Sequence, residues 1–378
     1  MFGTTEPELA DRPTPEVGRK LAAVRSLVER RQLDAVVLQR ADAVAWVTGG
    51  LTNRIEAGNP VSAAWVVVTP DAAHVVTTNV ELPRLAAEAG LDGFELHGAD
   101  WFEPDGLARL AEEVCDAPPE RIGGFGIDVD DDLVALRLAL DSAEQERLSA
   151  LAVDAARALE RALRGWAPGE LDLDVQARVA GELERVGAFA ACLIVGGDDR
   201  VERFRHPLAA AAPMRHLVMA VVVAERHGLH AAATRFASAG PLPDSVRAAR
   251  LAAAEVERLV LAASRPSATY GDALLALADA YAAVGHAGEW RDHYQGGPIG
   301  YRQREFEIVP TQVDSRWWTA PVSAGTAVAW NPSIAGGGKC EDTYLVQPNG
   351  LLRLTDTGDW PLEDGRPAVL DIVGGEAA

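Results

Sequence analysis

The sequence is poor in cysteine and in positive charge, and it has no long apolar run. Its three cysteines, Cys115, Cys192 and Cys340, are odd in number and widely spaced, and no two of them form a CxxC pair. This pattern indicates neither a disulfide framework nor a zinc knuckle, and it favours a reducing, cytoplasmic location. The apolar run at residues 217–224 has 8 residues, whereas a membrane helix needs about 20. Residues 1–20 are polar and acidic, so we expect no signal peptide.

The balance of charge limits the possible partners. The chain has 35 Lys and Arg against 56 Asp and Glu, which gives a net charge of −21. Nucleic acids and anionic membranes both need basic side chains to neutralise phosphates, so we expect neither as a partner. With 378 residues, of which 48% are hydrophobic, the chain is long enough for two or three domains and a large core.

Residues 14 to about 135 alternate helical and strand patterns. Residues 15–31 have the spacing of an amphipathic helix, and residues 34–38 form a short apolar run that is typical of a buried strand. The alternation predicts a small α/β domain with a boundary near residues 138–142. The other elements expected in it are strands at 63–68, 75–76 and 122–127 and a helix at 81–89.

The rest of the chain has a different order of elements. Ser142 and Gln145 stand three residues apart in a capping-box pattern, which predicts the start of a helix. Apolar residues then repeat at helical spacing as far as Gly165. Two helices, a hairpin, two helices and late strands are expected. The helices are 142–164, 173–185, 244–263 and 271–284, and the strands are 189–195, 217–223, 231–237, 327–331, 343–347 and 351–354.

Four segments carry a family resemblance. They are a hairpin that includes residues 217–223 and Thr234-Arg235, the Gly-rich stretch Asp292–Tyr301, Trp330-Asn331-Pro332, and Glu341-Asp342-Thr343. Together they resemble the pita-bread-fold (M24) peptidases, namely methionine aminopeptidase, aminopeptidase P and prolidase, and their metal-free relative creatinase. The resemblance implies an α/β (α+β) fold with a creatinase-type N-terminal domain at residues 1–140, a pita-bread domain at 141–378, and a homodimer.

The same resemblance indicates that metal ligands have been replaced. Metal-dependent members carry two Asp on a hairpin, one His in the Gly-rich loop and two Glu on late strands. The matching positions here are, in order, Val221, Ala232, Gly297, Asn331 and Glu341. A divalent ion needs several ionised or imidazole ligands to offset its dehydration, and Glu341 alone cannot supply them. We therefore expect no metal and no other cofactor; an inert scaffold is the alternative.

Three histidines are candidates for acid–base catalysis, because an imidazole can move protons near neutral pH. His293 leads the Gly-rich loop, where family members use a His to contact substrate. His206 precedes the hairpin and is offset by two residues from Phe204, the position that matches the proton-shuttling His of creatinase. His230 matches the hairpin His of many members. For each histidine the structural alternative is a turn or surface position or a bond to a buried carbonyl.

Glu341 completes the candidate catalytic set. It matches the Glu with which creatinase is understood to hold a cationic substrate nitrogen. Lys339, two residues earlier, is a candidate for substrate binding, or it could neutralise Glu341. Arg54 lies in a polar Gly-rich loop, and creatinase-type dimers insert a loop from this region into the partner's site, where an Arg meets a substrate carboxylate. A solvated surface arginine is the alternative for Arg54.

Three further residues are candidates for substrate binding. Asn331 offers a donor and an acceptor where the metal peptidases have a ligand Glu. Arg304 occupies a family His position; it could bind a carboxylate in bidentate fashion or join Glu305 in a buried structural salt network. Gln295 could orient a substrate with its amide.

The sequence therefore predicts a metal-independent hydrolase that cleaves a C–N bond of a small polar amide or amidino compound by His-mediated acid–base chemistry. The partner would be this small-molecule substrate. Two alternatives stay open: an elimination lyase on the same fold, and a catalytically silent protein that acts in binding or assembly.

Overall fold

The computed structural model describes residues 13–52 and 54–373. It divides into two compact units, residues 1–137 and 138–378. The fold is mixed α/β, as the sequence predicts. No helix in the described part of the chain is both long enough and apolar enough to cross a membrane.

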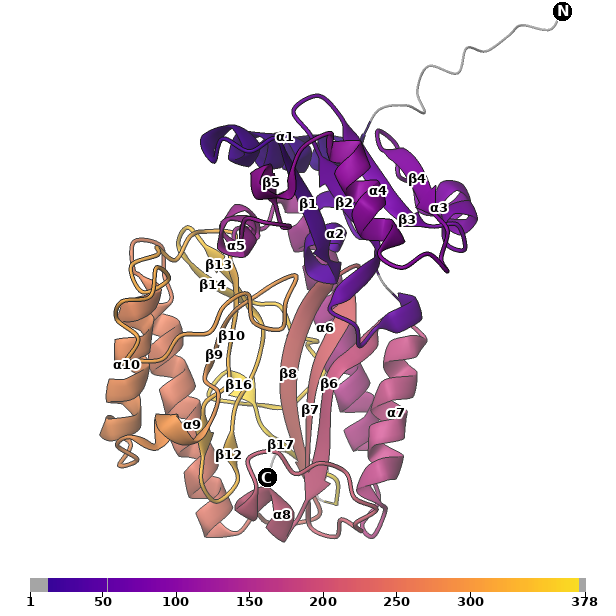
Figure 1. The fold of residues 1–378 in the computed structure, drawn as a ribbon. Helices are drawn as coiled ribbons and strands as arrows, with labels where there is room; N and C mark the ends of the chain where they lie inside the picture. Colours follow the sequence, from indigo (N-terminus) through magenta and orange to yellow (C-terminus); the bar gives the residue numbers. More distant parts are fainter. Residues whose placement is uncertain (1–12, 53, 374–378) are drawn as a thin grey trace, which may run out of the picture. The chain divides into compact units, whose positions relative to one another are not determined.

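Unit 1 is built on a five-stranded mixed sheet in the order β4-β3-β2-β1-β5 (Figure 1). Neighbours β1–β2 and β2–β3 are antiparallel, whereas β3–β4 and β1–β5 are parallel. Strand β4 therefore lies at one edge, parallel to β3. The strands are β1 Ala35–Arg40, β2 Val61–Val68, β3 Ala73–Thr78, β4 Glu95–Ala99 and β5 Ile122–Gly123.

Helices pack on this sheet through apolar side chains. Val37, Val67 and Val76 share one face of the sheet with Ala111 of α4, and all are buried. Helix α1 begins at Pro15, where the Thr14 side chain accepts a hydrogen bond from the Val17 amide. The helices are α1 Pro15–Arg30, α2 Ala41–Thr48, α3 Leu82–Glu88, α4 Gly106–Cys115 and α5 Asp130–Arg137, with 3-10 turns η1 Arg54–Glu56 and η2 Pro119–Arg121.

The predicted strand at 122–127 is wrong in its second half. Gly124 has φ +82°, and a Cβ there would come within 2.1 Å of the Val37 carbonyl oxygen. The chain therefore turns at Gly124 and leaves only Ile122–Gly123 in the sheet.

The first half of unit 2 packs two helices against an antiparallel hairpin. Helix α6 has the predicted bounds 142–164, but Asp141 is its N-cap in place of Ser142, and Glu144 completes the capping box. Its buried Leu148, Leu151 and Leu159 face the sheet β17-β8-β7-β6. The elements are α6 Ser142–Arg164, α7 Asp172–Glu184, β6 Phe189–Gly197, α8 Asp199–Arg203, β7 Leu217–Arg226, β8 Leu229–Ser238 and β17 Val369–Asp371.

The second half repeats this arrangement with two more helices and a second sheet, β14-β13-β10-β9 (Figure 1). Thr269 caps α10 in a capping box with Asp272. Helix α9 packs against the β11–β12 hairpin. The elements are α9 Asp244–Ala263, α10 Tyr270–Ala283, η3 Glu289–Asp292, β9 Gly296–Ile299, β10 Ala327–Trp330, β11 Ser333–Ile334, β12 Gly338–Lys339, β13 Tyr344–Gln347, β14 Gly350–Arg353, β15 Leu362–Glu363 and β16 Arg366–Pro367.

A buried ion network joins the two halves of unit 2. Arg235 of β8 pairs with Asp342 at 2.8 Å and with Glu160 of α6 at 3.4 Å. Thr355 adds a 2.6 Å bond from its hydroxyl to Asp342. Because all four residues are buried, breaking one pair would leave an uncompensated charge inside the protein. The network fixes the segment that follows β12, including Glu341.

Candidate active site

Backbone hydrogen bonds bring three distant segments of unit 2 together. The Thr234 amide of β8 donates to the Glu341 carbonyl at 2.8 Å. The Asn331 amide, at the end of β10, donates to the Gln295 carbonyl at 3.1 Å, and the Cys340 amide donates to the Pro332 carbonyl at 3.3 Å. Consequently Asn331, Glu341 and the loop that holds His293 lie in one region.

Glycine is required where this loop meets β10. Gly296 has φ +82°, and a Cβ there would lie 2.2 Å from the Ala329 carbonyl oxygen. Gly297, at φ +141°, sits opposite Ala329 in the β9–β10 ladder. The Gly-rich stretch thus lets the loop run directly onto the sheet, which positions His293.

The hydrogen bonds of His293 fix its tautomer. Its Nδ1 faces the Tyr294 carbonyl oxygen, an acceptor only, so Nδ1 carries the proton. Its Nε2 then carries a lone pair and no proton. That atom lies 3.1 Å from Nε2 of His206 and 3.3 Å from Nζ of Lys339. His293 Nε2 therefore accepts a hydrogen bond from a neighbouring donor and has no proton of its own to donate.

Burial and positive charge keep these groups from protonating readily. Desolvation first, then Lys339 and His206, hold the pKa of His293 far below its usual range. Burial and Lys339 also lower the pKa of His206, although that side chain is exposed. Lys339 itself is 3% exposed, and burial lowers its pKa while Glu341 opposes the change. The charge on the buried Lys339 therefore affects the pKa of both imidazoles.

Arg205 and Glu289 hold His206 in position. The Arg205 guanidinium pairs with Glu289 at 2.6 Å and donates to the hydroxyl of Ser333 at 3.2 Å. Ser333 is opposite Lys339 in the β11–β12 hairpin. Arg205, the residue before His206, is therefore bonded to β11, the strand that pairs with the strand of Lys339. No sequence motif assigned a role to Arg205.

The carboxylate of Glu341 pairs with an arginine and not with Lys339. Its carboxylate, 2% exposed, lies 3.1 Å from Nη2 of Arg304 and 3.5 Å from the Thr234 hydroxyl. Arg304 also donates to the Gln303 carbonyl at 2.6 Å. Arg304 therefore forms an ion pair with Glu341, whereas the structural alternative expected it to pair with Glu305. Lys339 instead reaches His293.

The two amides of the site have opposite environments. Gln295 is buried and fully bonded: its Oε1 accepts from the Tyr281 hydroxyl at 3.0 Å, and its Nε2 donates to two carbonyls, those of Trp290 and His293, at 2.9 Å each. These bonds favour a structural role for Gln295. Asn331 is 7% exposed, yet its Oδ1 has no hydrogen-bond partner among the described residues. A buried acceptor without a partner is costly, which makes Asn331 the stronger candidate for binding.

One predicted site residue, His230, is not brought into this group. His230 lies near the hairpin turn, where its Nδ1 is 3.2 Å from the Gly300 carbonyl oxygen and its amide donates to the same atom at 2.7 Å. These contacts favour the structural alternative for His230. Arg54 begins η1 in unit 1, and its side chain lies outside the described residues.

Two of the positions that the resemblance assigns to metal ligands, Val221 and Ala232, hold buried apolar side chains. Val221 is buried in an apolar cluster with Met219 and Phe236. At Ala232 the Thr343 hydroxyl accepts from the amide at 2.8 Å and donates to the carbonyl at 2.9 Å. Cys192 of β6 packs against the same cluster, and burial followed by Glu341 raises the pKa of its thiol. No sequence motif pointed to Cys192.

Comparison with known proteins places this geometry in a known fold. Residues 20–164 match the family described as the creatinase/prolidase N-terminal domain, which extends past the division between the units into α6. No curated protein matches the chain significantly.

Solved structures match nearly the whole chain. Dipeptidase PepE from Mycobacterium ulcerans is 21% identical with a TM-score of 0.72, over 94% of this chain and 97% of that one. The prolidase from Pyrococcus horikoshii OT3 is 17% identical with a TM-score of 0.71, over 90% and 98%. The N-terminal domain of FACT complex subunit SPT16 from Cicer arietinum is 13% identical with a TM-score of 0.66, over 91% and 97%. The chain therefore has a creatinase-like N-terminal domain and a prolidase-like fold throughout, as the resemblance implied.

Proposed function

We propose that this protein is a metal-independent hydrolase that cleaves a C–N bond in a small polar amide or amidino compound. The prolidase-like fold is consistent with a hydrolase. The working unit in this proposal is a homodimer with a small-molecule substrate. The proposal rests on one observation, the chain of contacts from Lys339 through His293 to His206.

This chain of contacts leads from a buried amine to solvent. Lys339 is buried, His293 is half-buried and His206 is exposed. The two contacts, at 3.3 and 3.1 Å, are both within hydrogen-bond reach. Because His293 Nε2 carries no proton, His206 holds the proton between the two rings and is the group that can exchange it with water. We therefore assign proton transfer to His206 and a positioning role to His293.

Lys339 supplies the positive charge that a metal ion would supply elsewhere. A buried ammonium stabilises negative charge that develops on a substrate oxygen, because little water screens it. Val221, Ala232 and Gly297 offer no ligand atoms in their side chains, and Glu341 is engaged with Arg304. These residues do not fit a divalent ion, which supports chemistry without one.

Asn331 sets the expected class of substrate. Its unpartnered Oδ1 is a buried acceptor, and amides and amidines carry the N–H groups that would satisfy it. A cavity of about 60 Å³ lies beside this region and is lined by Arg205, Ser333 and Lys339, whereas Asn331 is not among its lining residues.

The proposed reaction consumes only the substrate and one molecule of water. Water attacks the substrate carbon and gives a proton to His206, while Lys339 stabilises the oxygen that becomes negative. The C–N bond then breaks, its electron pair goes to nitrogen, and His206 returns the proton to that nitrogen. The products are one acid or carbonyl compound and one amine.

One observation favours the silent alternative. The Arg304–Glu341 pair joins two of the predicted site residues to each other, and such a pair can close a site as well as build one. A structure of the same fold is named as a subunit of the FACT complex. In that case the protein would bind ligands or partners without turnover.

Chelator-treated protein offered small amides, ring amides, amidino compounds and Xaa-Pro dipeptides separates these possibilities. The proposal predicts turnover that survives the chelator, oxygen from labelled water in the product, and a loss of about 100-fold or more in kcat for His206→Ala. His216→Ala, at an exposed single histidine, is the matched control. Metal-dependent cleavage of Xaa-Pro peptides would contradict the proposal. Products without labelled oxygen would indicate a lyase, and binding without turnover would indicate a silent protein.

A further inference from the structure

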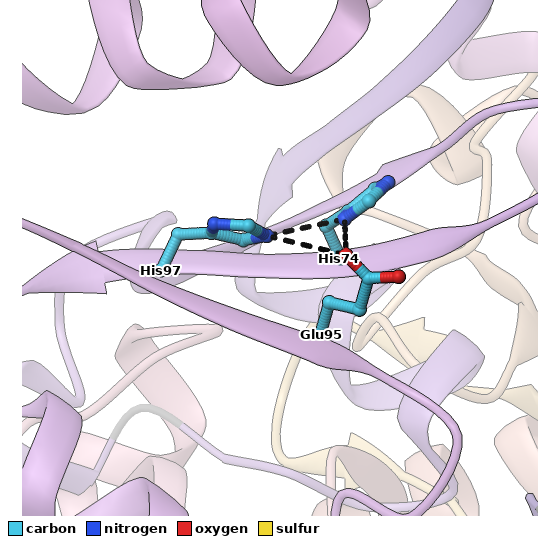
Figure 2. A group of neighbouring side chains, drawn as sticks. All are labelled: His74, Glu95 and His97. Atoms are coloured by element: carbon cyan, nitrogen blue, oxygen red, sulfur yellow. Dashed lines mark hydrogen bonds and ion pairs between the residues drawn. The ribbon is translucent and has the colours of Figure 1, made fainter.

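Unit 1 contains a second group of histidines that the proposed function does not use. His74 lies on β3, and Glu95 and His97 lie on the neighbouring parallel strand β4. Figure 2 shows the three side chains turned toward one another. Among residues 13–52 and 54–373, they are the one group of three His, Cys, Asp or Glu side chains whose ligand atoms converge.

The sheet itself produces this convergence. His74 pairs directly with Glu95, and His97 follows Glu95 by two residues, so strand periodicity puts all three on one face. Val76, two residues after His74, belongs to the buried cluster under α4. His74 is therefore only 9% exposed, whereas the Glu95 side chain at the sheet edge is 67% exposed.

The separations match a zinc site. His74 Nδ1 lies 3.2 Å from His97 Nε2 and 3.4 Å from Glu95 Oε2, and His97 Nε2 lies 4.0 Å from the same oxygen. A point equidistant from three atoms so placed is about 2.1 Å from each, which is the length of a zinc bond to nitrogen or oxygen. Two imidazoles and one carboxylate are also a donor set that zinc prefers.

We propose that His74, Glu95 and His97 form a Zn²⁺ site in which water is the fourth ligand and which fastens the edge strand β4 to β3. The longest separation involves the exposed Glu95 carboxylate, which can rotate toward His97. That movement lifts the ion out of the plane of its three ligands and completes a tetrahedron with water. Burial lowers the pKa of His74, which favours the neutral form that binds metal.

The same three residue types could hold iron(II) in an octahedral site. The facial ligands of such a site are about 3.0 Å apart at bonds of about 2.1 Å, closer together than the three atoms here. The separations thus favour zinc. The remaining possibility is a pair of imidazoles that share one proton and bind no ion.

Zinc titration of the chelator-treated full chain, followed by calorimetry and by metal analysis after gel filtration, tests the site. We expect one equivalent of Zn²⁺, and binding at least about 100-fold weaker in both His97→Ala and Glu95→Gln. The control variant His216→Ala, which changes an exposed histidine outside the cluster, should bind zinc as the parent does. Glu95→Gln keeps the shape of an exposed side chain, so its loss of binding cannot be attributed to misfolding.

Two further readouts identify the metal and its location. Zinc should raise the melting temperature of the parent and leave that of His97→Ala unchanged, and cobalt(II) should give the intense visible absorption of a tetrahedral site. His206→Ala should still bind one equivalent. Absence of zinc binding, binding that His206→Ala removes, or a preference for iron(II) with the pale spectrum of an octahedral site would overturn the proposal.

Discussion

Unit 1 and unit 2 each contain two histidines whose rings are in close contact. The two pairs differ in the charged side chain that lies beside them. In the lysine cluster, His206, His293 and Lys339, the two ring nitrogens are 3.1 Å apart and the third group is an amine. In the carboxylate cluster, His74, Glu95 and His97, they are 3.2 Å apart and the third group is a carboxylate.

The ring geometry of the two pairs is similar. Centroids are 4.9 Å apart in the lysine cluster and 5.2 Å apart in the carboxylate cluster, with interplanar angles of 63° and 51°. A carboxylate attracts a metal ion to the imidazoles, whereas an ammonium repels it and lowers their pKa. We propose that this difference in the neighbouring charge directs one pair of rings to metal binding and the other to proton transfer.

The largest effect is expected when the charge in the carboxylate cluster is reversed. Glu95→Lys removes one zinc ligand and puts a cation beside the other two, so zinc should bind more than about 100-fold more weakly. Calorimetry measures the change. Glu103→Lys, at another exposed carboxylate of unit 1, controls for net charge. Equal affinity in Glu95→Lys and the parent would show that Glu95 is not a ligand.

The reverse exchange should create metal affinity in the lysine cluster. Lys339→Glu places a carboxylate near His206 and His293, and zinc affinity there should rise by about 10-fold or more. The measurement is one equivalent of zinc bound in a His97→Ala background, in which the site of unit 1 is lost. Lys339→Met is the control for loss of the amine alone. Zinc binding by Lys339→Met but not by Lys339→Glu in that background would contradict the electrostatic account.

The two amides beside the lysine cluster should respond in opposite directions. Asn331→Leu removes a buried acceptor without a partner, so the free energy of unfolding should rise by about 1 kcal/mol while substrate binding falls. Gln295→Met removes three bonds, so that free energy should fall by about 2 kcal/mol. Urea unfolding measures both. Destabilisation by Asn331→Leu would mean that Asn331 serves the fold and is not held for a ligand.

The smallest effect concerns pH. His293 has a lowered pKa in the folded chain because of burial, Lys339, His206 and Arg205, so the unfolded chain binds its proton more readily. Its contribution to stability is therefore complete above about pH 6.5 and declines as the pH falls below that value. In His293→Gln the decline of the unfolding free energy from pH 6.5 to 5.5 should be shallower, by at most about 1.4 kcal/mol. His216→Gln should keep the parent slope, and an unchanged slope in His293→Gln would contradict the burial and charge described here.

Local signals in the sequence predicted the fold well. Helix α9 spans Asp244–Ala263, as its apolar spacing predicted, and the turn at residues 348–350 joins β13 to β14. The capping pattern selected Ser142 as the N-cap of α6 in place of Asp141, because both residues are good N-caps. Helix α2 was not predicted; it is short and mostly apolar, and no side chain caps it. The parallel pairing of β17 with β8 joins residues too far apart in sequence for any local pattern to reveal.

The candidate site was predicted in its residues more than in its contacts. Motif matching selected His206 and His293, which are 87 residues apart in sequence and in contact in the fold. It did not predict that Lys339 would reach His293 while Arg304 takes Glu341, because those partners depend on side-chain packing. His74 and His97 looked unremarkable in sequence, since only the parallel register of β3 and β4 brings them together.

Zinc-edge anomalous diffraction from crystals of the full chain soaked with zinc tests the central claim most directly. The account predicts one strong peak among His74, Glu95 and His97 and no peak beside Val221, Ala232, Gly297, Asn331 and Glu341. A strong peak at Glu341, at the position that metal-dependent relatives use, would contradict it.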